Sequence, residues 1–129
     1  MIVLPKGFSF RVSPEINNRV NVYLERTVRL HTKVVGNICL VRHNRDSFET
    51  HSWLAEKFHG KGLGTLLYAK AIQWCLDNGY KVRSSGTTLE AAQRVWRGKG
   101  LRKYFTILTH KDGTNHHFDM FYAVAKRSK

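Results

Sequence analysis

A glycine-rich stretch that leads directly into an apolar helical pattern constrains this chain more than any other feature. The stretch reads His59-Gly60-Lys61-Gly62-Leu63-Gly64-Thr65. Glycine allows backbone turns and close approaches that other residues forbid. The first amides of a helix have no partners within it, and the helix dipole makes that end positive. We therefore expect residues 59–65 to hold an anion, such as the phosphate of a ligand.

The helix after this loop is predicted to run from Leu63 to Asp77. Its apolar residues recur at helical spacing and form one broad face: Leu63, Leu66, Leu67, Tyr68, Ala71, Ile72, Trp74, Cys75 and Leu76. Asn78 and Gly79 should end the helix, because glycine readily adopts the left-handed conformation found at helix C-termini.

The first half of the chain is predicted to form strands, because apolar and polar residues alternate with a period of two. The expected strands are 8–12, 20–24, 28–31, 34–41 and 48–56, with a polar turn at 42–46. After the long helix we expect a strand at 80–84. A second helix should begin at the capping-box spacing of residues 87–90 and stop near Gly98 or Gly100. Strands at 104–109 and 118–124, joined by a turn at 111–114, complete one domain over residues 1–129.

The charge of the chain is the second strong signal. Its 22 Lys and Arg residues against nine Asp and Glu give a formal net charge of +13. This excess favours a polyanionic partner, such as nucleic acid or an acidic protein surface. The basic residues are spread along the chain, however, which also fits a generally basic surface that partly serves the phosphates of one ligand.

The sequence also bears on the cellular compartment. No apolar stretch is long enough to cross a bilayer, and the first residues lack the layout of a signal peptide. Cys39 and Cys75 fall inside predicted elements and are expected to be buried free thiols. We therefore expect a cytoplasmic protein with no membrane partner.

Residues 48–101 resemble the GNAT superfamily of acyl-CoA-dependent N-acyltransferases. The family's (Arg/Gln)-x-x-Gly-x-Gly loop stands here as His59-Gly60-Lys61-Gly62-Leu63-Gly64, and Ala92-Gln93-Arg94-Val95-Trp96 with Gly100-Leu101 is similar to the family's later helix. The resemblance implies an α+β fold with a mixed, mostly antiparallel sheet and two main helices. The first half of the chain leaves no room for the two helices that family members usually place between their first two strands.

The resemblance further implies acetyl-CoA as the cofactor. Its pyrophosphate would rest on the amides of the glycine loop, and its pantetheine arm would pair with the preceding strand, where the family splays its sheet. The implied cofactor-binding residues are Ser52, Trp53, Leu54, His59, Gly60, Lys61, Gly62, Leu63, Gly64 and Thr65. A P-loop is not formed, because no Gly-Lys-Ser/Thr closes the motif, and the glycine spacing differs from a dinucleotide fingerprint.

Acyl transfer to an amine needs a base that takes the amine proton. Glu49 and His51 share one face of the predicted strand before the loop, where the family often carries its base, and imidazoles titrate near neutral pH. Both also fit a plain surface role. Counted back from the motif, the family's positions fall nearer Phe48 and Thr50, so a bulge would be needed to restore the register.

Three positions depart from the family pattern. His59 replaces the usual Arg or Gln, and Leu89 stands where an asparagine often opens the second helix. Trp96 stands where family members often have a tyrosine that protonates the leaving thiolate, and an indole cannot do so. Tyr104 is the expected substitute acid, although plain core packing also explains it.

The predicted function is an N-acyltransferase that moves an acetyl group from acetyl-CoA to an amine in a ternary complex, since neither cysteine lies near the motif. The missing helices imply an open site that accepts a macromolecule or a flexible tail. Two alternatives remain: a basic nucleic-acid-binding protein of this fold without catalysis, and an enzyme that modifies nucleic-acid bases. The seven histidines lack tight zinc-ligand spacing, so no metal site is expected.

Overall fold

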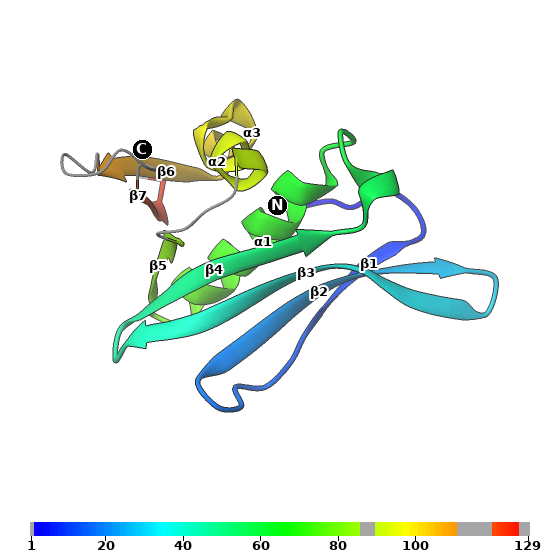
Figure 1. Ribbon diagram of the computed structural model, residues 1–129, viewed down its shortest axis with the longest axis horizontal. Helices are drawn as coiled ribbons and strands as arrows, with labels where there is room; N and C mark the ends of the chain where they lie inside the picture. Colours follow the sequence, from blue (N-terminus) through cyan, green and yellow to red (C-terminus); the bar gives the residue numbers. More distant parts are fainter. Residues whose placement is uncertain (1, 86–89, 111–119, 127–129) are drawn as a thin grey trace.

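The fold is built on one seven-stranded sheet, seen in the computed structural model, which describes residues 2–85, 90–110 and 120–126 (Figure 1). The strand order is β1-β2-β3-β4-β5-β7-β6, and each pair of neighbours is antiparallel except β4 and β5. The strands are β1 (Phe8–Val12), β2 (Arg19–Val28), β3 (His31–Asn44), β4 (Ser47–Leu54), β5 (Lys81–Ser84), β6 (Phe105–His110) and β7 (Met120–Ala125). The predicted mixed, mostly antiparallel sheet of an α+β fold is confirmed.

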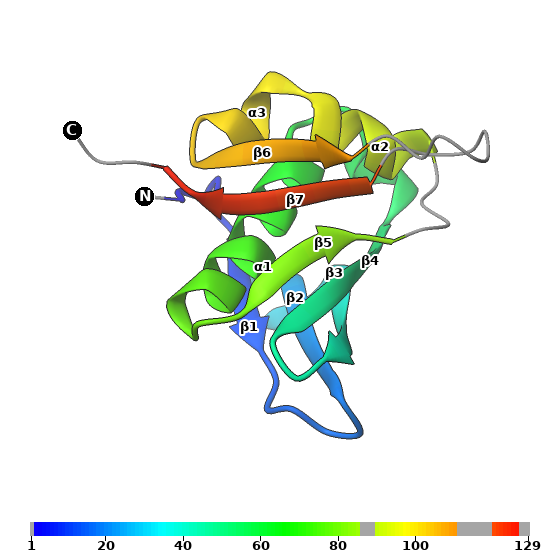
Figure 2. The same ribbon diagram turned by 90° about the vertical axis from the view of Figure 1, so that its left-hand side faces the viewer.

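The helices follow the glycine loop. The long helix α1 (Leu63–Asp77) packs against the sheet, and α2 (Glu90–Arg97) and α3 (Lys99–Arg102) lie beside it near β6 (Figure 2). A short 3-10 turn, η1 (Glu56–Phe58), joins β4 to the loop. No helix interrupts residues 2–55, so the predicted absence of the first-half helices is confirmed. None of the helices that the structure describes is long and apolar enough to span a membrane.

The core lies between α1 and one face of the sheet. Alternate residues of β2, β3 and β4 point to this face, as the period of a strand requires; among the fully buried ones are Val20, Val22, Leu24, Ile38, Leu40 and Phe48. Trp96 of α2 is also fully buried, where its ring stacks on Phe121 of β7 with centroids 6.0 Å apart. The helix face of α1 is slightly rotated from the prediction. Tyr68 and Ile72 are buried, whereas Leu66 and Trp74 are half-buried.

The strand boundaries differ from prediction at three places. The segment 28–31, predicted as a strand, is the tip of the β2–β3 hairpin, where Arg29 adopts a left-handed φ of 57°. The predicted turn at 42–46 is shorter, because β3 continues to Asn44 and Arg42 pairs with Phe48. The strand predicted over 48–56 ends at Leu54, because residues 56–58 form η1. In each case side-chain alternation was a poor guide to where the backbone turns.

The second half follows the prediction closely. Helix α1 has the predicted bounds, and Gly79 after it has a left-handed φ of 80°. Helix α2 stops before Gly98 as expected, but α3 then adds a turn that was not predicted. The predicted capping residues 87–89, the hairpin turn at 111–114 and residues 118–119 of the last strand lie outside the described residues.

Both cysteines are free thiols, and burial makes them poor nucleophiles. Cys75 is fully buried on α1, which raises the pKa of its thiol to about 12. Cys39 of β3 is half-buried rather than buried, and desolvation raises the pKa of its thiol despite the nearby Arg19 guanidinium.

We predict that only Cys39 reacts with a disulfide reagent in the native protein at mildly alkaline pH. A raised pKa depletes the reactive thiolate, so the reaction of Cys75 should wait for unfolding and that of Cys39 should accelerate as the pH rises. Colorimetric thiol counts should give one reactive group in buffer and two in denaturant, and Cys39→Ala should abolish the native reaction. Two rapidly reacting thiols in the folded protein would contradict this prediction.

Candidate active site

The glycine loop ends in an open helix N-terminus. Gly60 and Gly62 have φ angles of 75° and 79°, in the left-handed region that favours glycine. Gly62 is the N-cap of α1, and within the described residues no side chain caps it and no acidic residue occupies the first turn. The free amides of that turn therefore face outward with no competing negative charge, as an anion site requires.

A pocket of about 560 Å³ opens at this helix end, between β4, α1 and α2. Its lining includes eight residues predicted to bind the cofactor: Ser52, Trp53, Leu54, His59, Gly60, Gly62, Gly64 and Thr65. The other two lie elsewhere, because Leu63 is buried in the core and the Lys61 ammonium lies 6.0 Å from the centre of the Phe58 ring. The remaining lining residues come from α1 and α2: Leu67, Tyr68, Ala91, Ala92, Arg94 and Val95.

The sheet divides beside this pocket. Strand β5 pairs with β4 only from Ser47 to Thr50, and β4 then continues to Leu54 with no described strand on that side. The amide of Ala55 donates to the Val35 carbonyl of β3, 2.8 Å away. Because peptide groups alternate along a strand, the amides and carbonyls of Ser52 and Leu54 point to the open side. This edge can hydrogen-bond an extended ligand that contains amides.

His59 has a structural role that the sequence motif did not predict. Its Nε2–H donates to the Leu54 carbonyl across 2.7 Å. The bond connects the start of the glycine loop to the end of β4, so it occupies one of the two carbonyls on the open edge. A histidine at the family's usual Arg or Gln position therefore helps to set the loop against the strand.

The phenol that the structure places in the pocket is Tyr68. Its hydroxyl donates to the Ser52 hydroxyl at 2.7 Å, and its ring meets Trp96 edge-on. Burial raises the pKa of Tyr68, with smaller opposing effects from Ser52 and Thr50, so its hydroxyl stays protonated at neutral pH. Tyr104, the predicted substitute acid, lies between α3 and β6 and is not among the lining residues. Sequence periodicity had assigned Tyr68 only to the core-facing side of the helix.

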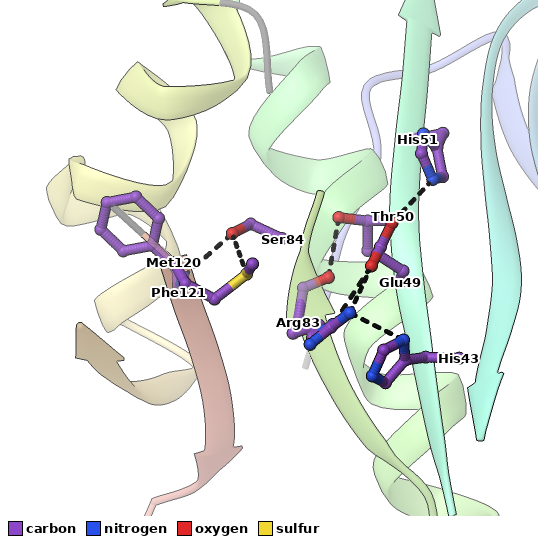
Figure 3. Close-up of polar contacts among 8 residues, drawn as sticks. All are labelled: His43, Glu49, Thr50, His51, Arg83, Ser84, Met120 and Phe121. Carbon is purple, nitrogen blue, oxygen red and sulfur yellow. Dashed lines mark hydrogen bonds and ion pairs between the residues drawn. The ribbon is translucent and has the colours of Figure 1, made fainter. Parts of the chain in front are cut away.

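Glu49 and His51 lie together on the sheet face opposite α1 (Figure 3). His51 Nε2 is 3.2 Å from Glu49 Oε1. Arg83 of β5 holds the other carboxylate oxygen, with Nη2 donating to Glu49 Oε2 at 2.7 Å. The same Nη2 donates to His43 Nδ1, also at 2.7 Å. The guanidinium thus fixes Glu49 while the His51 side chain, 45% exposed, stays accessible to a ligand.

The polar group around Glu49 and Arg83 lies where β4 and β5 begin to separate. Thr50 Oγ1 donates to the Arg83 carbonyl at 3.1 Å, which closes the last joined position of β4 and β5. Beyond it, the Ser84 hydroxyl accepts the Phe121 amide at 2.9 Å and donates to Met120 Sδ at 3.4 Å, so the end of β5 is tied to β7 (Figure 3). The two strands therefore part at Thr50, between the pocket and Glu49.

The register of β4 settles which residues share this face. Pairing with β3 runs without irregularity from Phe48 to Leu54, so the bulge needed to restore the family register is not present. Phe48 and Thr50 are buried toward α1, and Glu49 and His51 point the other way. Arg83 and His43 were not singled out from the sequence, because nothing in it signals that β5 pairs with β4. Among the described residues, no group of three or more His, Cys, Asp or Glu side chains forms a candidate metal site.

Comparison with known proteins identifies the family. The model of the acetyltransferase (GNAT) family matches residues 9–101, which is more than half of the chain. The chain belongs to the GNAT family. This GNAT protein is therefore an acetyltransferase. No curated protein sequence matches it.

Solved structures that resemble this GNAT protein share its fold at low sequence identity. A GNAT acetyltransferase from Elizabethkingia anophelis, with acetyl-CoA bound, superposes with a TM-score of 0.59 at 12% identity, covering 92% of this chain and 97% of that one. A domain from Methanocaldococcus jannaschii gives a TM-score of 0.59 at 17% identity, covering 86% and 69%. An IAA acetyltransferase from Bacillus cereus gives 0.52 at 16% identity, covering 82% and 76%.

Proposed function

We propose that this protein transfers the acetyl group of acetyl-CoA to an amine of a macromolecule or flexible chain. The observation that carries the proposal is the pocket that joins the open N-terminus of α1 to the unpaired edge of β4. At the α1 end of the pocket, free helix amides can bind an anion. At the β4 end, the unpaired strand edge can hydrogen-bond an extended ligand. The related protein from E. anophelis, whose structure holds acetyl-CoA, supports this choice of donor.

The residues at the pocket fit such a ligand. A Cβ added at Gly60 or Gly62 would meet no atom within 4 Å, so open space lies above the loop. The amides of the first turn of α1 would hold the pyrophosphate, and the exposed guanidinium of Arg94 adds a cation to the pocket wall. Ser52 would hydrogen-bond the pantetheine amides through its amide and carbonyl, and Leu54 through its amide, because His59 already occupies the Leu54 carbonyl.

Acetyl transfer requires two proton transfers, one from the amine and one to the thiolate, and residues of this chain would carry out both. Acetyl-CoA, when bound, supplies an activated acetyl group and a thiolate leaving group. As the amine nitrogen bonds to the acetyl carbon and the carbon–sulfur bond breaks, His51 takes the amine proton. Glu49, held by Arg83, orients the His51 ring through the contact between Oε1 and Nε2. Tyr68 donates a hydrogen bond or a proton to the thiolate from the pocket side, and Tyr104 remains a second candidate for this role.

The acceptor would approach across the sheet face that carries Glu49 and His51. No helix of the described residues covers the β1–β4 part of this face, and the side chain of Trp53 there is 54% exposed. An uncovered face imposes little restriction on the size of the acceptor. It therefore favours an amine on a protein, a peptide tail or a nucleic acid over one enclosed small molecule.

We expect acetyl-CoA to bind with a dissociation constant below about 1 mM in calorimetry, within the ordinary range for enzyme substrates. CoA release measured against polyamines, lysine-containing peptides and amine-bearing nucleic acid should then reveal the acceptor class. A thioester without a nucleotide serves as the control, because it lacks the pyrophosphate that the loop would hold. Absence of acetyl-CoA binding by the folded protein would refute the proposed donor.

A further inference from the structure

A run of basic residues lies on α2 and α3, mostly outside the pocket. Residues 94–103 contain five cations and no acidic residue: Arg94, Arg97, Lys99, Arg102 and Lys103. All five are exposed, while Trp96 and Leu101 between them are fully buried. The two buried side chains anchor the segment to the core and direct the cations outward. We call Arg97, Lys99, Arg102 and Lys103 the α2–α3 cluster.

The cofactor pocket does not account for this cluster. Arg94 lines the pocket, but the four members of the cluster do not. Lys99, Arg102 and Lys103 take part in none of the ion pairs found among the described residues. Cations in the last turn of a helix interact favourably with its dipole, which accounts for Arg97 at the end of α2. The other three cations of the cluster lie beyond the end of α2, so this effect does not account for them.

A further cation extends the surface along the sheet edge. Strand β6 begins two residues after Lys103, and its first residue, Phe105, pairs with Ala125 of β7. That register places the exposed Lys126 beside the end of the cluster. The cluster therefore runs from α2 toward β6, the last strand in the order of the sheet (Figure 2). Like charges so close together repel one another in the free protein, and a bound polyanion relieves this repulsion.

The composition of the surface identifies the kind of partner. Protein interfaces are built around aromatic or aliphatic anchors and are depleted in lysine, and membrane-surface segments need an apolar face. None of the exposed large apolar side chains of the described residues lies in residues 90–104. A segment whose charged side chains from 94 to 103 are all Lys or Arg suits the closely spaced phosphates of a nucleic acid, where counterion release drives binding without sequence readout.

We propose that the α2–α3 cluster binds the phosphate backbone of nucleic acid. This binding does not depend on acetyl transfer. It concerns residues outside the pocket, so it can be tested separately from the donor site.

The test is fluorescence anisotropy with a labelled DNA duplex, titrated from about 50 to 200 mM salt. The variant Lys99→Gln/Arg102→Gln/Lys103→Gln is compared with Lys6→Gln/Lys33→Gln/Arg45→Gln, which removes three exposed cations elsewhere. Each variant lowers the formal net charge from +13 to +10, since three cations are removed. The cluster variant should bind at least about tenfold more weakly, and its log–log salt slope should fall by up to about 2.7, at about 0.9 per lost phosphate contact.

Several outcomes would overturn the proposal: no duplex binding by the wild type at the lowest salt, equal weakening by the two triple variants, or equal affinity for polyglutamate or anionic vesicles. Calorimetry with acetyl-CoA checks the cluster variant, which should bind it as the wild type does. If the triple variant fails to fold, Arg102→Gln alone should still weaken duplex binding and lower the slope. A single variant with wild-type binding and slope would then reject the site.

Discussion

Replacing Gly64 with aspartate is expected to weaken acetyl-CoA binding by at least about tenfold, or about 1.4 kcal/mol. Gly64 lines the pocket in the first turn of α1, where the ligand's pyrophosphate would lie. A carboxylate there places like charges close together, and such pairs interact by several kcal/mol before salt screening. The measurement is the dissociation constant of acetyl-CoA by calorimetry.

The matched control is Gly64→Asn, which has nearly the same shape without the charge. A Cβ at this position meets only Leu54 Cδ2, at 3.8 Å, so both variants should fold. Aspartate in the first turn of a helix favours the dipole by about 0.3–1 kcal/mol. The aspartate variant should therefore be the more stable of the two and the weaker binder. Equal acetyl-CoA affinity in the two folded variants would show that no phosphate lies at this turn.

Replacing His51 with alanine is expected to lower kcat by about a hundredfold or more, the usual contribution of a general base. The measurement is CoA release with whichever acceptor proves active. Glu49→Gln should also lower kcat, because it removes the carboxylate that lies 3.2 Å from the imidazole. Neither residue lines the pocket, so the dissociation constant of acetyl-CoA should stay unchanged in both variants.

His43→Ala is the control for this prediction. His43 hydrogen-bonds Arg83 on the same face, and among the described residues no hydrogen bond or ion pair joins it to Glu49 or His51. Its loss should leave kcat near the wild-type value. If His51→Ala and Glu49→Gln both keep wild-type rates, the base lies elsewhere, and the protein acts mainly by holding the amine against the thioester.

The same assay distinguishes the two candidate acids. Tyr68→Phe removes the hydroxyl that donates to Ser52 in the pocket, and Tyr104→Phe changes a phenol outside it. Tyr68→Phe should lower kcat with little change in acetyl-CoA affinity, whereas Tyr104→Phe should not. The opposite result would restore Tyr104 as the proton donor.

Local sequence patterns predicted the glycine loop and the helix that follows it well. The bounds of α1, the left-handed glycines and the open helix end depend on residues close together in the chain. Helical periodicity and glycine conformations are properties of such short segments. The pairing of Glu49 with His51 was predictable for the same reason, since residues two apart on a strand share a face.

Errors arose where the backbone turns without a glycine or proline signal. Arg29 takes the left-handed conformation at the β2–β3 tip, and its sequence neighbourhood alternates like a strand. The end of β4 was overestimated because Glu56 continued the alternation although residues 56–58 coil into η1. The roles of individual candidate site residues stay predictions until the variants are measured.

The sequence by itself determined the family, the glycine loop and the helix that presents it, because each depends on a short, contiguous pattern. Only the tertiary structure decided which distant side chains meet. Arg83 reaches Glu49 from 34 residues away, and Tyr68 reaches Ser52 from 16. Such contacts follow from strand register and from the parallel pairing of β4 with β5, and a one-residue shift in register would turn every side chain to the opposite face.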